Sequence, residues 1–140
     1  MQDAAESNKA LILRMFQDVF AGDSFDPQIL ERYFSPKFIQ HADGQTLDFN
    51  GLVDHVRELK RTVTNLRFSF EYMLAESSKV MDVHRVTGEK RAGGAIAARL
   101  FSLWIIEDGK IVLCDELSRI EEGAAEDRDL ASRTSPKRIP

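Results

Sequence analysis

The sequence has little of what marks secreted, membrane-spanning or fibrous proteins. Its 140 residues include a single cysteine, Cys114, so no disulfide can form within the chain, which fits a reducing compartment. No apolar run approaches the roughly 20 residues that a membrane-spanning helix needs, and the N-terminus shows no secretory signal. Only four prolines and eight glycines are present, which excludes collagen-like and low-complexity chains. We therefore predict a cytoplasmic globular protein that makes no membrane contact.

Positive charge is also scarce. The chain has 19 lysines and arginines against 23 aspartates and glutamates, which gives a net charge of −4. Because no basic stripe offsets this balance, the sequence offers no electrostatic surface for nucleic acid. Hydrophobic residues make up 43% of the chain, which excludes wholesale disorder, and the length fits one domain.

The apolar pattern predicts helices first and strands afterwards. Three segments have apolar residues at helical spacing: 7–21, 27–35 and a stretch that begins near Asn50. Asp26-Pro27 is expected to start the second helix, a short extended piece is expected around 36–49, and Asp108-Gly109 predicts a hairpin turn. After about residue 65 the period shortens to that of a strand, which predicts four strands: 66–74, 79–87, 96–106 and 110–119. This order is typical of an α+β domain with an antiparallel sheet. From Glu121 onward the apolar pattern stops, so we expect one domain over residues 1–120 and a polar, mobile tail over residues 121–140.

Both faces of the predicted sheet are apolar. The third strand alternates two sets of residues: Leu100, Ser102, Trp104 and Ile106 on one face, and Phe101, Leu103 and Ile105 on the other. The first strand alternates in the same way, with one set expected to be buried: Leu66, Phe68, Phe70, Tyr72 and Leu74. The helices can cover only one face of such a sheet. We therefore expect a second copy of the chain to cover the other face, which gives a homodimer through the sheet.

A few polar residues interrupt the strands and are candidates for a site. Asp82 and His84 are two residues apart, so their side chains share one face of the second strand. On the last strand Cys114 and Glu116 share a face, and Asp115 lies on the opposite one. Alternation alone leaves open whether Asp115 or Glu116 faces the interior.

Several motifs, in the same order along the chain, resemble the SnoaL-like proteins of the nuclear transport factor 2-like superfamily. They are the segment from Tyr33 to His41 (YFSPKFIQH), Asn50-Gly51, Leu66-Arg67-Phe68, Val86-Thr87-Gly88 and the hairpin IEDGKIV at 106–112. The resemblance implies a cystatin-like fold, in which a curved antiparallel sheet wraps around three N-terminal helices to form a cone with an apolar pocket. Members include polyketide cyclases, ketosteroid isomerase-like enzymes, dehydratases and non-catalytic proteins.

The resemblance also implies which residues line the pocket. Glu116 takes the position that is usually Asp in cyclase-like members, which directs it inward, and the other polar candidates are His41, Asp82 and His84. Further wall residues are expected from the same comparison: Tyr33, Phe38, Tyr72, Trp104 and Cys114. In such a pocket Glu116 or Asp82 would act as a base, with His84 as its partner and His41 as donor to an oxyanion.

Each candidate also has a purely structural interpretation. His41 could cap the end of an extended segment, His84 could be a hydrogen-bonded core histidine, and Asp82 could pair with Arg85 or Arg99 at an exposed edge. Cys114 could be a small apolar residue packed in the core. His55 is expected at the surface of the third helix.

Two classes of function therefore stay open. The first is a cofactor-independent isomerase, cyclase or dehydratase that acts on a small apolar carbonyl compound, since a desolvated base and one hydrogen-bond donor suffice for that chemistry without a metal. The second is a non-catalytic protein that binds an apolar small molecule or serves as a dimerising interaction module.

Overall fold

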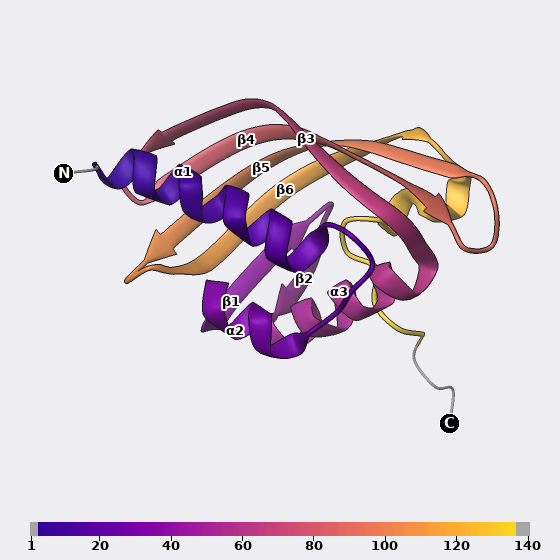
Figure 1. Ribbon diagram of the computed structural model, residues 1–140, viewed down its shortest axis with the longest axis horizontal. Coiled ribbons are helices and arrows are strands. Elements are labelled where there is room, and N and C mark those ends of the chain that lie inside the picture. Colours follow the sequence, from indigo (N-terminus) through magenta and orange to yellow (C-terminus); the bar gives the residue numbers. More distant parts are fainter. Residues whose placement is uncertain (1–2, 137–140) are drawn as a thin grey trace.

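The protein folds as three helices and one curved six-stranded sheet, as a computed structural model of residues 3–136 shows (Figure 1). The helices are α1 (Ala4–Met15), which continues as a π-helical turn over Phe16–Phe20, α2 (Pro27–Tyr33) and α3 (Phe49–Thr62). The strands are β1 (Phe34–Ala42), β2 (Gln45–Asp48), β3 (Val63–Glu76), β4 (Lys79–Lys90), β5 (Ala95–Glu107) and β6 (Lys110–Glu122). The predicted α+β class, with helices before the long strands, is confirmed.

Each helix begins at an aspartate that caps its free backbone N–H groups. Asp3, Asp26 and Asp48 accept hydrogen bonds of 2.8 to 2.9 Å from backbone nitrogens two or three residues ahead. At α2 the cap is followed by Pro27 in the first helical position, where the missing N–H costs nothing. The start predicted for this helix from Asp26-Pro27 is confirmed.

The sheet has the order β2-β1-β6-β5-β4-β3. The four long strands form the predicted antiparallel meander, and the expected turn at Asp108-Gly109 joins β5 to β6 through two residues with positive φ. The segment 36–49, expected only as a short extended piece, is part of a hairpin. Its first strand, β1, pairs in parallel with β6, so the sheet is mixed.

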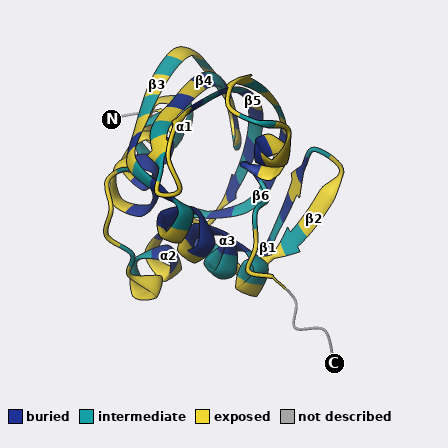
Figure 2. Cartoon of the chain, turned by 90° about the vertical axis from the view of Figure 1, so that its right-hand side faces the viewer, coloured by how far each residue is buried: buried dark blue, intermediate teal, exposed yellow. Residues whose placement is uncertain are grey.

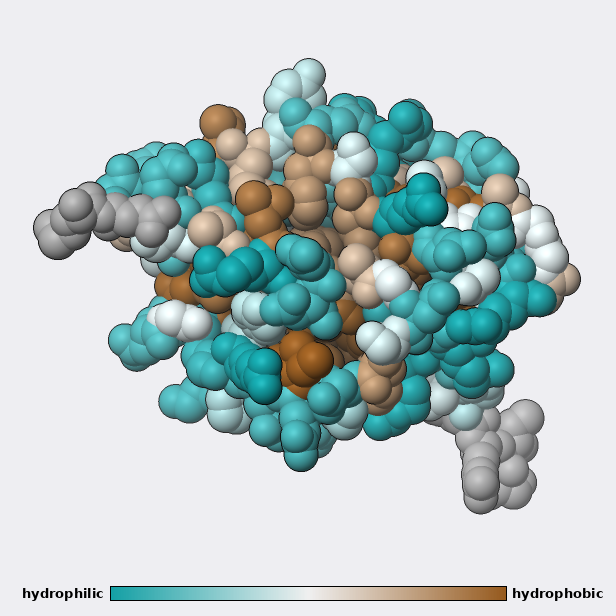
Figure 3. Space-filling view, in the orientation of Figure 1, coloured by the Kyte–Doolittle hydropathy of each residue, from teal (hydrophilic) through white to brown (hydrophobic). Residues whose placement is uncertain are grey.

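The curved sheet folds over the helices, and together they form a ring when viewed from the side (Figure 2). Buried residues line the inside of this ring, from both the sheet and the helices. On the face shown in Figure 3, hydrophilic side chains dominate, and hydrophobic ones gather near the centre between α1 and α2. Within the described range, no helix is both long and apolar enough to cross a bilayer.

A bulge in β3 reverses the predicted orientation of its second half. The pairing with β4 shifts by one residue between Phe70 and Tyr72, so the alternation breaks at Glu71. Phe68 and Phe70 pack against the core as predicted, but Tyr72 and Leu74 point outward and are 66% and 75% exposed. The prediction that Tyr72 lines the pocket is therefore wrong.

The segment after residue 120 packs against the domain, in contrast to the predicted mobile tail. β6 continues to Glu122, and a 3₁₀ turn follows over Ala125–Asp129. Leu130 and Ala131 are buried in the hydrophobic core, because they cover an apolar surface that the helices leave open. We call residues 123–136 the C-terminal strap. Residues 137–140 of the predicted tail lie outside the described residues.

Candidate functional site

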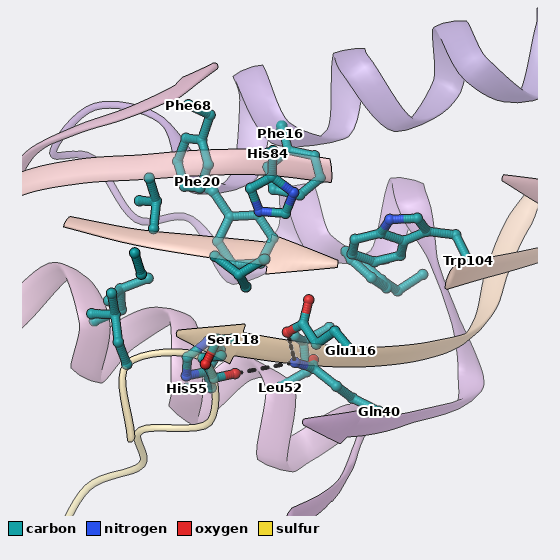
Figure 4. Close-up of a pocket in the computed structure, with 17 residues that line it drawn as sticks. Phe16, Phe20, Gln40, Leu52, His55, Phe68, His84, Trp104, Glu116 and Ser118 are labelled. Atoms are coloured by element: carbon teal, nitrogen blue, oxygen red, sulfur yellow. Dashed lines mark hydrogen bonds between the residues drawn. The ribbon is translucent and has the colours of Figure 1, made fainter. Parts of the chain in front are cut away.

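A pocket lies between the helices and the inner face of the sheet (Figure 4). Its wall is mainly aromatic and aliphatic, with Phe16, Phe20, Phe34, Phe68 and Trp104 as the aromatic members. A smaller set of polar side chains interrupts this wall: Gln40, His55, His84, Glu116 and Ser118. An apolar wall with a few polar groups is typical of small-molecule sites.

Asp82 and His84 form a buried pair at this pocket. The side-chain carboxylate of Asp82 lies 2.5 Å from Nδ1 of His84, and its second oxygen accepts a hydrogen bond of 2.8 Å from Nε1 of Trp104. An ionised carboxylate only accepts hydrogen bonds, so the hydrogen between the pair belongs to Nδ1 of His84. Nε2 of His84 is then the nitrogen available to a ligand. Since both oxygens of Asp82 have partners, Asp82 is placed to orient His84.

Glu116 is the second ionisable group of the wall and is buried. One of its carboxyl oxygens accepts from Nε2 of Gln40 at 2.9 Å, and the other accepts from the hydroxyl of Ser102 at 3.0 Å. Burial raises the pKa of Glu116 from 4.5 to about 7, although nearby His84, when it is protonated, and the Ser102 hydrogen bond act in the opposite direction. The carboxyl can therefore hold or release a proton near neutral pH.

The orientation that the sequence left open on β6 is now clear. Glu116 and Cys114 are buried on the inner face, and Asp115 is exposed on the outer face. Trp104, His84 and Glu116 line the pocket as predicted from the resemblance, and Asp82 lies directly behind His84.

The remaining predicted site residues lie outside the pocket lining. His41 is exposed on the opposite side of β1 and contacts the hydroxyl of Thr46 at 3.1 Å, because strand alternation turns inward the residues on either side of it. It therefore cannot donate to an oxyanion in the pocket. Tyr33 is buried but hydrogen-bonds to Asp18. Phe38 and Cys114 are also fully buried, behind the residues that line the pocket.

Phe38 supports the wall from a second layer, and Cys114 is a free, buried thiol. The ring of Phe38 packs against Phe34 with the ring centroids 4.8 Å apart, and it is Phe34 that lines the pocket. Burial raises the pKa of the Cys114 thiol well above its usual range. Cys114 is therefore a packed hydrophobe, in agreement with the structural interpretation.

Besides Ser118, two polar residues of the lining, Gln40 and His55, were missed as site residues. Gln40 lies two positions after Phe38, on the inward face of β1, and donates to Glu116. His55, expected at the surface, is only 3% exposed because it lies on the same stripe of α3 as Leu52 and Leu59. Both positions follow the period of their element, so the signal was present in the sequence.

The C-terminal strap closes one part of the wall. Leu130 and Ala131 line the pocket, and the carbonyl oxygen of Ala131 accepts a hydrogen bond of 3.2 Å from Gln40. The carbonyl oxygen of Arg133 lies 2.7 Å from Nδ1 of His55. The strap is thus joined to the polar groups of the site at two points.

A comparison with known families agrees with this architecture. The SnoaL-like domain family matches residues 12–114, which is most of the chain. The chain belongs to the SnoaL-like family. An uncharacterised protein of fission yeast (Schizosaccharomyces pombe) is 24% identical over 128 residues, which cover 91% of this chain and 98% of the yeast protein.

Solved structures with the same fold have different names and chemistries. A candidate SnoaL-like polyketide cyclase from Jannaschia has a TM-score of 0.72 and 15% identity, covering 84% of this chain and 89% of its own. An LEH-like epoxide hydrolase from Mycobacterium tuberculosis has a TM-score of 0.70 and 8% identity, covering 84% of this chain and 81% of its own. At such identities the likeness shows the fold, and the reaction has to be argued from the site itself.

Proposed function

We propose that this SnoaL-like protein is a cofactor-independent enzyme that moves a proton on a small apolar carbonyl compound, as an isomerase, cyclase or dehydratase does. The observation that carries the proposal is that two ionisable groups, the Asp82–His84 pair and Glu116, belong to one largely apolar pocket. A base and an acid in a desolvated site are the two groups that enolisation needs.

The hydrogen bonds assign a role to each group. Nε2 of neutral His84 removes a proton from the carbon next to the carbonyl, and Asp82 stabilises the imidazolium that forms. Glu116, in its protonated form, donates a hydrogen bond to the carbonyl oxygen as negative charge develops there. Gln40 and Ser102 hold the Glu116 carboxyl in place by binding one oxygen each. The expectation that Glu116 or Asp82 is the base is thus replaced by His84 as base and Glu116 as acid.

Deuterium exchange tests this proposal without knowledge of the natural substrate. α-Tetralone, an apolar ketone, would be incubated with the protein in D₂O, and loss of its α-protons would be followed by proton NMR. Binding would first be measured from the fluorescence of Trp104, the only tryptophan, which lines the pocket. We expect exchange in the wild-type protein and a decrease of about 10²-fold or more in His84→Asn, since general base catalysis contributes that much.

His41→Ala is the matched control for His84→Asn. Both variants lose an imidazole, but His41 is exposed and outside the pocket, so its removal should leave exchange unchanged. If α-tetralone binds and the wild-type protein exchanges it no faster than His84→Asn does, the catalytic proposal is wrong. The alternative, a pocket that only binds an apolar molecule, would then be favoured.

We also propose that two copies associate through the outer face of the sheet. An apolar row crosses four strands there, from Tyr72 through Val83 and Phe101 to Leu117, and Tyr72 and Leu117 are 66% and 67% exposed. Several charged residues of this face pair within the chain, for example Arg99 with Glu71 at 2.9 Å and Arg85 with Glu121 at 2.7 Å. A face with an exposed apolar row and compensated charges suits a second copy of itself.

Sedimentation at micromolar concentration tests this association. We expect a dimer for the wild-type protein and a monomer for Leu117→Glu, which places a charge at one end of the apolar row. A wild-type monomer would contradict the proposal. The free, buried thiol of Cys114 supports the further proposal that the protein is cytoplasmic.

A further inference from the structure

His55 contributes a second polar contact to the pocket, separate from the acid and base. It extends from α3, on the same stripe as Leu52 and Leu59, and all three residues line the pocket. In Figure 4 its ring lies on the α3 side of the cavity, and Trp104 lies at the other side. Neither the Asp82–His84 pair nor Glu116 has a hydrogen bond with it among the described residues.

The hydrogen bond to the C-terminal strap determines which tautomer His55 adopts. Nδ1 lies 2.7 Å from the carbonyl oxygen of Arg133, and a carbonyl oxygen only accepts, so Nδ1 carries the hydrogen. Burial lowers the pKa of His55, and the charge of Arg133 acts in the same direction, while Asp54 and Asp129 and the hydrogen bond to the strap oppose it. The ring is therefore neutral, and Nε2 is an acceptor with a free lone pair.

Within the described part of the chain, Nε2 of His55 has no hydrogen-bond partner. All fully inaccessible side-chain nitrogens and oxygens of those residues do have one, so Nε2 must keep access to the space that His55 lines. The donor for this acceptor must come from that space, from water or from a bound molecule, because an acceptor buried without a donor costs about 1–3 kcal/mol.

We propose that His55 selects ligands that carry a hydroxyl group, by accepting a hydrogen bond from it at Nε2. This inference rests on the pocket binding a small apolar molecule, but not on catalysis. A cation buried in the pocket would need a negative charge beside it. The only carboxyl among the described lining residues is Glu116, so an uncharged donor is favoured. The ligand class is therefore an apolar ring compound with a hydroxyl group at the end that faces α3.

The strap is part of this recognition, because its backbone sets the tautomer of His55. It is anchored next to the ring by Ser135, whose backbone N–H donates to Asp54 at 2.9 Å, and by Arg133, whose guanidinium donates to the hydroxyl of Thr62 at 3.1 Å. When the strap is docked, Nδ1 of His55 donates its hydrogen to the Arg133 carbonyl, so Nε2 can accept a hydrogen bond from the ligand.

Two isomeric probes distinguish a hydroxyl donor from shape alone. 4-Ethylphenol and 4-methylanisole have the same atoms, but only 4-ethylphenol can donate a hydrogen bond. We expect the wild-type protein to bind 4-ethylphenol about threefold to tenfold more tightly, as measured by calorimetry, since a neutral hydrogen bond contributes about that much. In His55→Asn, whose amide nitrogen can still donate to Arg133, the preference should disappear while the affinity for 4-methylanisole is unchanged.

A second measurement does not depend on how the variant folds. The chain has three histidines, so a long-range ¹H–¹⁵N spectrum of the wild-type protein resolves each ring. We expect the Nε2 signal of His55 to shift on addition of 4-ethylphenol and to stay in place with 4-methylanisole. Equal affinity for the two probes, or an unmoved Nε2 signal, would overturn this inference and leave the pocket itself intact. If neither probe bound, the proposal of an apolar ligand would fail as well.

Discussion

Replacing Glu116 with glutamine tests how strongly burial perturbs this carboxyl. Glutamine has nearly the same shape and is neutral at every pH. Its amide oxygen can still accept from Gln40, and its amide nitrogen can donate to the hydroxyl of Ser102, which accepts as well as donates. Glu116→Gln should therefore fold as the wild-type protein does and remove only the charge.

The size of the effect follows from the pKa of Glu116, which is 4.5 ordinarily and about 7 in the folded protein. Between these values the folded chain holds a proton that the unfolded chain has released, so folding is favoured less as the pH rises. The free energy of unfolding of the wild type, relative to that of Glu116→Gln, should therefore not change with pH below 4.5. It should decrease between pH 4.5 and about pH 7 and stay constant above that. One pKa unit corresponds to about 1.4 kcal/mol, so the full loss is about 3 kcal/mol.

Urea unfolding of both proteins, followed by circular dichroism, measures this difference. The comparison cancels the titration of groups that both proteins share. The measured quantity is the free energy of unfolding of Glu116→Gln minus that of the wild type. We expect this difference to be about 3 kcal/mol larger at pH 8 than at pH 4. A difference that does not change with pH would mean that the Glu116 carboxyl has an ordinary pKa, and would refute the reasoning.

Three further predictions concern the residues around the site. Trp104→Phe should lower the free energy of unfolding by about 1–3 kcal/mol, because one oxygen of buried Asp82 loses its donor; an unchanged urea midpoint would contradict this. His41→Ala should change the free energy of unfolding by less than about 0.5 kcal/mol, since the side chain is exposed; a larger loss in the same experiment would mean that it is packed. Leu130→Asp should release the C-terminal strap, so that amide hydrogen exchange accelerates in residues 123–136 and not in the sheet. Faster exchange throughout the chain would show that the strap and the domain unfold together.

Features that depend on neighbouring residues in the chain were predictable. The cap at Asp26, the turn at Asp108-Gly109 and the change from helical to strand period all act within a few residues. The order of helices and strands, and with it the fold class, follows from such local signals.

Features that depend on pairing between distant segments were not predictable. The bulge at Glu71 is a property of the register between β3 and β4, and no glycine or proline marks it, so Tyr72 was assigned to the wrong face. Leu130 and Ala131 are two apolar residues in a polar stretch. They are buried only because the fold leaves an open apolar surface within their reach.

The candidate site was predicted in part. Alternation placed Asp82 with His84, and the resemblance placed Glu116 on the inner face, where the structure also has it. His41 was expected in the pocket because of its position in a motif, whereas the alternation of β1 directs Gln40 inward instead. His55 has the spacing of a buried residue, but its charged neighbours along the chain suggested a surface position.

The dependence of α-tetralone exchange on pH tests the central claim most directly, since it involves base and acid together. If Glu116 acts in its protonated form, the wild-type exchange rate should decrease as the pH rises above about 7, where this carboxyl ionises. In Glu116→Gln that decrease should be absent. A wild-type rate that rises steadily through this range, with the same profile in Glu116→Gln, would contradict the assignment of Glu116 as the acid.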